Sequence, residues 1–459
     1  MKRTLHPTGD FQCNWHIPGE DGTLRSFPGT LAVRGGERPA GDMHGVDPSE
    51  AEDQYPIRRR YPVLTATLAS GGSVLLTDVE VETFMPGRAW VQAGAAVISV
   101  ASFVGGVVPQ ANEIELQIES LDALSGIMPL KPDDSGADSW AARRNPEAIL
   151  TWVDAGITMT LDYVVTSGGL DPFSLRVEAS PRLTIRSESS LTLAQWIDDW
   201  VEPMQRVCSL ASGRACRVTY VVLRASSGEP GQLLQLYARG ITQEPYESEY
   251  REIFGRTTGV NLRGDDVSLL TLARGWQVAR DEQHPIVETY GSMLLVNDHP
   301  RSRFLLLLQA LEGAHGFQHR SAFEERLASH EAKVEALLVK VRACTNAKDR
   351  NKIKSAMKLV HPGLEEALTD VFDLLPIDTL PWFERTSLVK HVRARENVTV
   401  VGALRTVRND LAHGNRGYDT DDLRRVVLLL DRVVRAQALK HLGCSEPTIE
   451  RVLRSGGKR

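Results

Sequence analysis

The chain lacks the short motifs that mark the commonest cofactor-dependent and hydrolytic enzymes. Its 459 residues hold no GxxxxGK(S/T) loop and no GxGxxG turn, so the usual NTPase and dehydrogenase architectures are not indicated. It also has no HExxH pair, GxSxG elbow or EF-hand loop, which removes the common zinc-protease, hydrolase and calcium-binding classes. An enzyme that works with its own side chains remains compatible with the sequence, and we expect no cofactor.

Cysteine is scarce, and its spacing excludes the common metal and redox motifs. Five cysteines are scattered through the chain without a CxxC pair, so neither a zinc knuckle nor a thioredoxin-type motif is present. An odd and dispersed set is typical of a reducing compartment. The first residues, MKRTLHPTGDF, contain no apolar stretch of the kind that a signal peptide needs. We therefore expect a cytoplasmic protein.

The chain has no excess of positive charge. Its formal net charge is -6 and its isoelectric point is about 6.1, so a nucleic-acid partner would have to be held by a local basic patch. One uncharged run, residues 89–112, is long enough to cross a bilayer. Polar residues and the Gly105–Gly106 pair interrupt this run, and Val and Ile dominate its centre, which favours two buried strands around a glycine turn. We expect no membrane partner.

The first half of the sequence has the pattern of β-strands. Apolar and polar residues alternate in segments such as EIELQIE (113–119) and GITMTLDYVV (156–165), with Gly, Pro, Asp and Ser between the segments. A single helix is predicted within this half, over 191–212. We predict a β-rich N-terminal domain at residues 1–250, built as an antiparallel sandwich or barrel.

The second half has the pattern of α-helices. Apolar residues recur with a period near 3.6 over 302–318, 322–343, 364–375 and 421–443. Thr420 is the expected N-cap of the last of these helices. We predict a helical connector at 251–295 and an all-α bundle at 296–459, so that the chain is a two-domain α+β protein.

The stretch VVGALRTVRNDLAHG (400–414) is predicted to be a helix over 400–413 that ends at Gly414. One side of this helix is aliphatic, and the opposite side is polar. The aliphatic side comprises Val400, Leu404, Val407 and Leu411; the polar side comprises Arg405, Arg408, Asn409 and Ala412, with His413 one turn beyond Asn409 and Arg416 continuing the line.

These residue types suit attack on a phosphodiester. Arginine offers a planar fork that matches phosphate oxygens and stabilises added negative charge. Histidine titrates near neutral pH and can take a proton from a 2′-hydroxyl, and no metal is required. A similar spacing of Arg and His occurs at Arg385–His391 and Arg435–His441, so the spacing alone does not identify a catalytic pair. The Asn after Arg408 and the Gly after His413 set this stretch apart.

The segment RNDLAHG, with FLLLLQALEGAHGF upstream and LRRVVLLLDRVVRAQALKHLG downstream, resembles a HEPN domain of the ApeA-like type. The resemblance covers roughly 300–445, and the β-rich first half is similar in order to the domain that precedes this bundle in ApeA antiphage defence proteins. It implies a metal-independent endoribonuclease with catalytic Arg408, Asn409 and His413. The 2′-hydroxyl would attack the adjacent phosphate, with transfer RNA as one candidate substrate, during abortive infection.

The resemblance also implies partners. HEPN ribonucleases usually act as dimers, so we expect a homodimer or a higher even homo-oligomer with a composite site, and RNA as the substrate. A phage-derived trigger is expected at the N-terminal domain. One alternative is a HEPN module that dimerises and binds RNA or protein without cutting, with the polar side of this helix as an ordinary salt-bridged surface. Another is that Arg408 and His413 are structural and make helix-end contacts inside the dimer.

Three further features bear on this site. The basic run at 340–358 is the densest in the chain, and we expect it to contact RNA through Lys348, Arg350, Lys352 and Lys354, together with Arg405 and Arg416. Glu312 is a candidate to orient the arginines from across the bundle. His315 and His319 have a usable metal spacing, but without a third strong ligand we expect no metal there.

Overall fold

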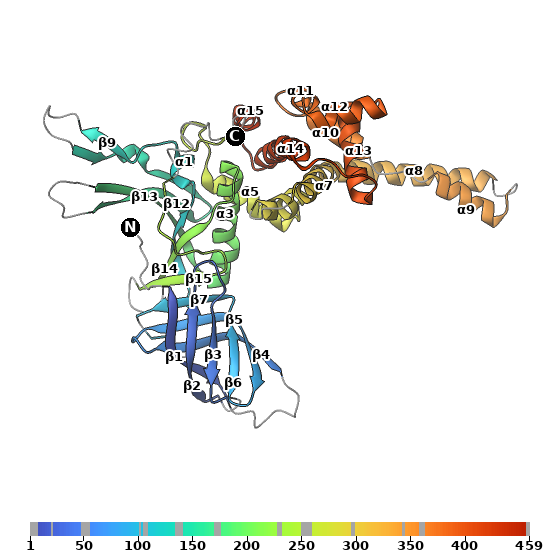
Figure 1. Ribbon diagram of the computed structural model, residues 1–459. Coiled ribbons are helices and arrows are strands. Elements are labelled where there is room, and N and C mark those ends of the chain that lie inside the picture. The colour runs from blue at the N-terminus through green and yellow to red at the C-terminus, as the bar shows by residue number, and fades with distance from the viewer. Residues whose placement is uncertain are drawn as a thin grey trace. The chain divides into compact units, whose positions relative to one another are not determined.

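The computed structural model divides the chain into two compact units, with the boundary after Gln277 and inside the predicted connector (Figure 1). The division falls within helix α5, Leu269–Asp281. The structure describes residues 8–19, 22–46, 56–100, 102–103, 109–133, 141–168, 176–226, 232–248, 259–294, 299–341, 345–357 and 363–455.

Six antiparallel strands close into a barrel at the start of the first unit. They are β1 (Gly9–Pro18), β2 (Leu24–Val33), β3 (Ala40–His44), β4 (Ile57–Leu68), β5 (Ser73–Met85) and β6 (Arg88–Gln92). The order is β5-β4-β1-β2-β3-β6, and β6 pairs back onto β5, which closes the ring. Trp15 fills the interior and donates from Nε1 to the backbone oxygen of Asp42 at 2.8 Å. Of the two predicted forms, sandwich and barrel, the structure has the barrel.

The first half of β5 continues the sheet away from the barrel. The further strands, in spatial order, are β7 (Ala95–Ser99), β15 (Leu233–Ala238), β14 (Val218–Ala225), β8 (Ala111–Ile118), β13 (Arg176–Leu191), β12 (Ile157–Gly168) and β11 (Leu150–Asp154). All of these pairings are antiparallel. A separate hairpin pairs β9 (Leu130–Asp133) with β10 (Ala141–Arg144). Short helices accompany the sheet: α1 (Leu121–Ser125), η2 (Pro146–Ala148), α2 (Leu193–Trp196), η3 (Ile197–Val201) and α3 (Glu202–Ser212).

The uncharged run at 89–112 contains strands, as expected, and β7 is buried along its whole length. The predicted turn at Gly105–Gly106 lies outside the described residues. Among the residues that the structure describes, none of the helices is both long and apolar enough to cross a membrane.

The second unit is helical. Its elements are η4 (Ile286–Tyr290), α6 (Gly291–Met293), α7 (Pro300–Gln318), α8 (Arg320–Val341), α9 (Ala347–Ala356), α10 (Leu364–Asp373), α11 (Leu380–Glu384), α12 (Ser387–Glu396), α13 (Val400–His413), α14 (Thr420–His441) and α15 (Glu446–Arg454). Helices α7 and α14 form its centre, where Phe304 and Leu308 are buried with Leu430 and Val434. The ion pair between Arg303 Nη2 and Asp431 Oδ1, at 2.7 Å, ties the same two helices together. The predicted order, a β-rich half followed by a helical half, is confirmed.

The N-cap of α14 differs from the prediction. Asp419, and not Thr420, accepts hydrogen bonds at 3.0 Å from the backbone N–H groups of Asp421 and Asp422. Both residues are good N-caps, but the Asp419 carboxylate adds a negative charge at the positive end of the helix dipole.

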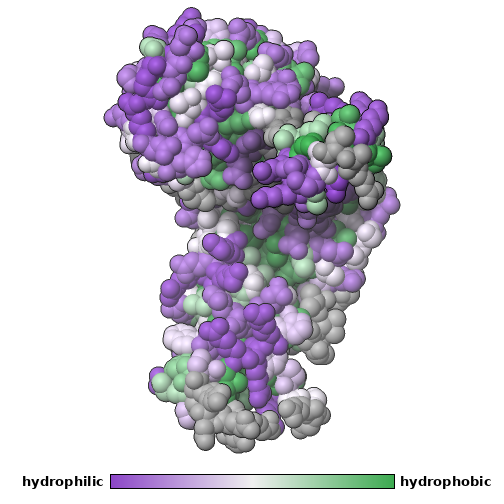
Figure 2. All heavy atoms as spheres, turned by 90° about the vertical axis from the view of Figure 1, so that its right-hand side faces the viewer, coloured by the Kyte–Doolittle hydropathy of each residue, from purple (hydrophilic) through white to green (hydrophobic). Residues whose placement is uncertain are grey.

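Helices α8 and α9 form an arm, here the α8–α9 arm, that projects from the rest of the helical unit (Figure 1). Along the 22 residues of α8 the buried residues are Phe323, Val334 and Leu338, and α9 has none. Hydrophilic side chains dominate the face of the molecule seen in Figure 2, with hydrophobic residues scattered among them. The arm therefore adds little to the core and exposes a large helical surface.

Candidate active site

Helix α13 is bounded by two local signals in its sequence. Thr399 caps its start by accepting from the backbone N–H of Gly402 at 2.9 Å. Gly414 ends it in the left-handed conformation, at φ 71°, where a side chain would be strained. The buried residues of the helix include Leu404, Val407 and Leu411. The predicted helix and its polar outer side are both confirmed.

Arg408 is held by two side chains. Its Nη2 lies 3.5 Å from Glu312 Oε2 on α7, and its Nη1 donates to Asn409 Oδ1 at 3.2 Å. The Arg408 side chain is 37% exposed and that of Glu312 is 36% exposed, so the pair lies at the surface with part of each group in reach of a ligand. The structure thus brings together Arg408, Asn409 and Glu312.

His413 occupies the last position of α13 and is exposed, as is Arg416 beyond it. Within the described ranges neither side chain has a hydrogen-bond or ion-pair partner. His413 follows Arg408 by five residues, which turns the two side chains about 140° apart on an ideal helix. Ideal helix geometry therefore places His413 and Arg408 of one chain on different sides of α13.

Arg405 is also paired with a carboxylate. Its Nη1 lies 2.8 Å from Glu365 Oε2, in the first turn of α10, and Thr399 Oγ1 donates to the other oxygen of Glu365 at 3.4 Å. A phosphate that binds Arg405 would have to compete with Glu365. The two arginines of α13 are thus each matched by one acidic residue, from α7 and from α10.

The end of α13 is fixed by residues that the sequence did not single out. Tyr418 donates from its hydroxyl to Asp410 Oδ2 at 2.5 Å, which anchors the chain after the helix. Burial, followed by this hydrogen bond, raises the pKa of Tyr418 to about 12. Arg301 Nη2 donates to the backbone oxygen of Leu411 at 2.5 Å. Asp410 was visible inside the RND triplet, but Arg301 lies 110 residues away and left no local signal.

The helical unit also has a counterpart among known families. Residues 305–448 match the Apea-like HEPN family. The matched segment runs from α7 into α15 and contains Glu312, Arg405, Arg408, Asn409 and His413. Comparisons with curated proteins and with solved structures gave no match. The match does not reach the N-terminal unit, whose similarity to ApeA proteins therefore remains a prediction.

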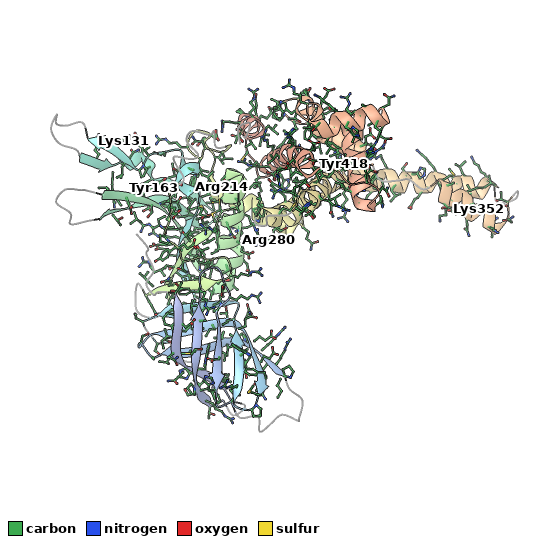
Figure 3. All side chains as sticks on the ribbon, in the orientation of Figure 1. Lys131, Tyr163, Arg214, Arg280, Lys352 and Tyr418 are labelled. Atoms are coloured by element: carbon green, nitrogen blue, oxygen red, sulfur yellow. The ribbon has the colours of Figure 1, made fainter. Side chains whose placement is uncertain are left out.

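The basic run on α9 lies apart from α13. Lys348, Lys352 and Lys354 are exposed on α9, whereas Arg350 is half-buried and donates to the backbone oxygen of Thr345 at 3.0 Å. Figure 3 shows Lys352 on the α8–α9 arm, well removed from Tyr418, which contacts α13. The α8–α9 arm and the polar side of α13 could contact the same RNA in two ways. The RNA could extend from one surface to the other, or the two surfaces could come from two chains.

A carboxylate lies next to His315 and His319, at the C-terminal end of α7. Asp370 Oδ2, on α10, accepts from His315 Nε2 at 2.8 Å. The ring centroids of His315 and His319 are 4.4 Å apart. The sequence could not supply this residue, because Asp370 comes from a helix 55 residues further along.

Proposed function

We propose that the HEPN domain is a metal-independent endoribonuclease, with Arg408, Asn409 and His413 as its catalytic residues. The observation that carries the proposal is the arrangement of α13 within the HEPN match. An arginine fixed by Glu312 and Asn409 lies on the same helix as an exposed histidine without a partner among the described residues. HEPN domains are generally ribonucleases, which agrees with this chemistry.

In this mechanism the 2′-oxygen of the RNA forms a bond to the adjacent phosphorus and the bond from phosphorus to the 5′-oxygen breaks. Neutral His413 accepts the proton of the 2′-hydroxyl, and the leaving 5′-oxygen takes a proton from water. Arg408 stabilises the extra negative charge on the phosphate oxygens in the transition state. The products carry a 2′,3′-cyclic phosphate and a 5′-hydroxyl.

The active site in this proposal is shared between two chains. Because Arg408 and His413 diverge on one helix, the Arg408 of one chain would act with the His413 of a second chain. The functional unit would be a homodimer or a higher even homo-oligomer. Arg405, Arg416 and the α9 residues Lys348, Arg350, Lys352 and Lys354 would then contact the RNA backbone.

At the level of the whole protein we propose an antiphage abortive-infection effector that acts in the cytoplasm. The N-terminal unit would receive a phage-derived trigger, and transfer RNA is a candidate substrate. A large β-rich unit joined to an enzymatic bundle suits a sensor coupled to an effector, which is an argument from architecture.

The alternative is a HEPN module that binds RNA or protein and dimerises without cutting. The observation in its favour is that Arg405 and Arg408 are both ion-paired, as the arginines of an ordinary helix surface often are. Under this alternative, RNA binding would survive His413→Ala and the RNA would stay intact.

The chemistry of the RNA ends tests the proposal. The full chain and its His413→Ala variant are expressed in cells, growth is followed, and cellular RNA ends are sequenced. The proposal predicts toxicity together with new 5′-hydroxyl and 2′,3′-cyclic phosphate ends for the wild type only. Identical RNA ends in both cultures would overturn it in favour of the binding module.

A further inference from the structure

Three ligand-type side chains converge where α7 meets α10. They are His315, on the last turn of α7, His319, which caps that helix, and Asp370 on α10. One nitrogen or oxygen from each lies within 4.8 Å of the other two. We propose that these residues bind one divalent transition-metal ion of the zinc class. The proposal does not depend on whether the domain cuts RNA.

Two of the three groups are already held in place. The His315 side chain is 6% exposed, and its Nε2 is bonded to Asp370 Oδ2 at 2.8 Å. His319 is exposed, and its ring centroid lies 4.4 Å from that of His315. A metal site often combines such a fixed pair with one ligand that closes on the ion, and binding would displace the proton between His315 and Asp370.

The distances suit a tetrahedral ion after small side-chain rotations. Ligand atoms at normal zinc bond lengths are about 3.3 Å apart in a tetrahedron. The present separations bracket that value, from 2.8 Å between His315 and Asp370 to at most 4.8 Å within the set. Two imidazole nitrogens and one carboxylate oxygen favour Zn²⁺ or Co²⁺ over Mg²⁺ and Ca²⁺.

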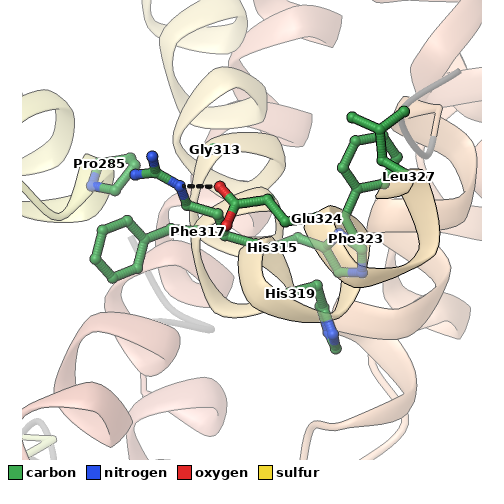
Figure 4. A pocket seen from close by; sticks show the side chains of 10 residues that line it. Pro285, Gly313, His315, Phe317, His319, Phe323, Glu324 and Leu327 are labelled. Carbon is green, nitrogen blue, oxygen red and sulfur yellow. Dashed lines mark hydrogen bonds and ion pairs between the residues drawn. The ribbon is translucent and has the colours of Figure 1, made fainter. Parts of the chain in front are cut away.

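The two histidines of the cluster also line a cavity. His315 and His319 line a cavity of about 470 Å³ at the junction of α7 and α8 (Figure 4). Arg320 and Glu324, at the same cavity, are paired with each other at 2.9 Å. In the proposed site a water molecule would complete the coordination, and the cavity beside the two histidines is its source.

A bound ion would link the two helices that supply the acidic partners of α13. Helix α7 carries both Glu312 and His315, and α10 carries both Glu365 and Asp370. Fixing the end of α7 to α10 would hold the carboxylates that position Arg408 and Arg405. The ion would act through these positions and would take no part in the proton transfers proposed above.

Cobalt titration tests the site without any measurement of activity. The purified full chain is treated with EDTA, dialysed and titrated with Co²⁺, and the visible d–d absorption is recorded. We expect one saturable Co²⁺ per chain, displaced by Zn²⁺, and a higher melting temperature with metal. His319→Ala and Asp370→Asn should each weaken binding at least about tenfold.

His391→Ala is the matched control, because His391 is also exposed but lies on α12, outside the cluster. It should bind Co²⁺ as the wild type does. His319→Ala leaves the His315–Asp370 hydrogen bond in place, so its circular dichroism should be unchanged. A wild type without saturable absorption, or with the same affinity as His319→Ala, would show that the cluster is only an ion pair beside an exposed histidine.

Discussion

The Arg408 guanidinium is fixed at both of its terminal nitrogens, by Glu312 from another helix and by Asn409 from its own. Exposed ion pairs contribute little to folding, typically less than about 1 kcal/mol. The value of this pair lies in the position that it gives to the guanidinium. A displacement of about 1 Å in a catalytic group can lower a rate by about a hundredfold.

Glu312→Gln should therefore lower the RNA cleavage rate about ten- to hundredfold while leaving the melting temperature nearly unchanged. Cleavage of a labelled RNA under single-turnover conditions measures the rate. Glu331→Gln is the control, since Glu331 is exposed on the α8–α9 arm. Wild-type rates for Glu312→Gln would show that Arg408 needs no partner across the bundle.

His284 is fully buried in the helical unit. Its Nδ1 accepts from the backbone N–H of Ile286 at 3.3 Å, its Nε2 has no partner among the described residues, and its ring stacks on His441. Burial, and then the neighbouring His441, lower the pKa of His284 to about 4. The unfolded chain binds a proton near pH 6.5 and the folded chain does not, so stability falls as the pH drops from about 6.5 to 4.

His284→Phe keeps a ring against His441 and removes the titration. In the wild type this group alone should cost about 2 kcal/mol of unfolding free energy between pH 7 and pH 5. Urea unfolding followed by circular dichroism at both pH values measures the loss, which should be smaller in the variant by about that amount. Equal pH dependence in the two proteins would contradict the account.

The sequence predicted which side chains of α13 share one side of the helix, because this follows from the helical period alone. Periodicity placed Arg405, Arg408 and Asn409 on the outer side of α13, and the contact of Glu312 with Arg408 agrees with the expected position across the bundle. The pairing of Arg405 with Glu365, and of His315 with Asp370, depends on how α10 packs. No local pattern in the sequence carries that information.

Helix α13 ends at Gly414, and this end places His413. Gly414 has φ 71°, where a Cβ costs about 1 kcal/mol or more. Gly414→Ala should therefore destabilise the helical unit by about 1 kcal/mol and lower cleavage by displacing His413. Thermal unfolding and the single-turnover assay measure the two effects.

Gly417→Ala is the control for that substitution. A Cβ at Gly417 would meet no atom within 4 Å, and its φ is not in the left-handed region. Its stability should change by less than about 0.5 kcal/mol. A similar effect of both substitutions would show that the turn at Gly414 has no special role.

Elements with strong periodicity and clear end signals were predicted with the right type, and α13 with the right bounds. Helix α14 shows the limit, because Asp419 and Thr420 are adjacent and both suit an N-cap. In the structure Asp419 is the cap, directly after Tyr418, whose hydroxyl donates to Asp410.

Across the whole molecule, the sequence predicted the order of a β-rich and a helical half but not how the sheet closes. Alternation identifies strands, and it cannot say that β6 pairs with both β3 and β5. The β5–β6 pair is a hairpin between consecutive strands, whereas the β3–β6 pair that completes the ring joins segments far apart in the chain. The sequence also could not predict that the basic residues of α9 lie far from α13. We grouped the two because both carry residues that suit RNA binding, and not because a pattern placed them together.

A composite site makes a prediction about mixed oligomers. Arg408→Ala and His413→Ala chains should each lose most of their activity, but a mixed dimer keeps one intact Arg408 and one intact His413 across its interface. After unfolding and refolding together, an equal mixture should recover about a quarter of the wild-type activity. No recovery, with mixed dimers shown by native mass spectrometry, would place the whole site in one chain.

The central claim is that Arg408 and His413 cut RNA without a metal ion. The most direct measurement is the cleavage rate of the wild type, Arg408→Ala and His413→Ala in EDTA, with His391→Ala as the control. The same rates are measured again with Zn²⁺, which separates any effect of the proposed metal site between α7 and α10. The account predicts losses of about 10²–10⁴-fold for His413→Ala and 10²–10³-fold for Arg408→Ala, under both conditions. Equal rates for all four proteins would contradict it.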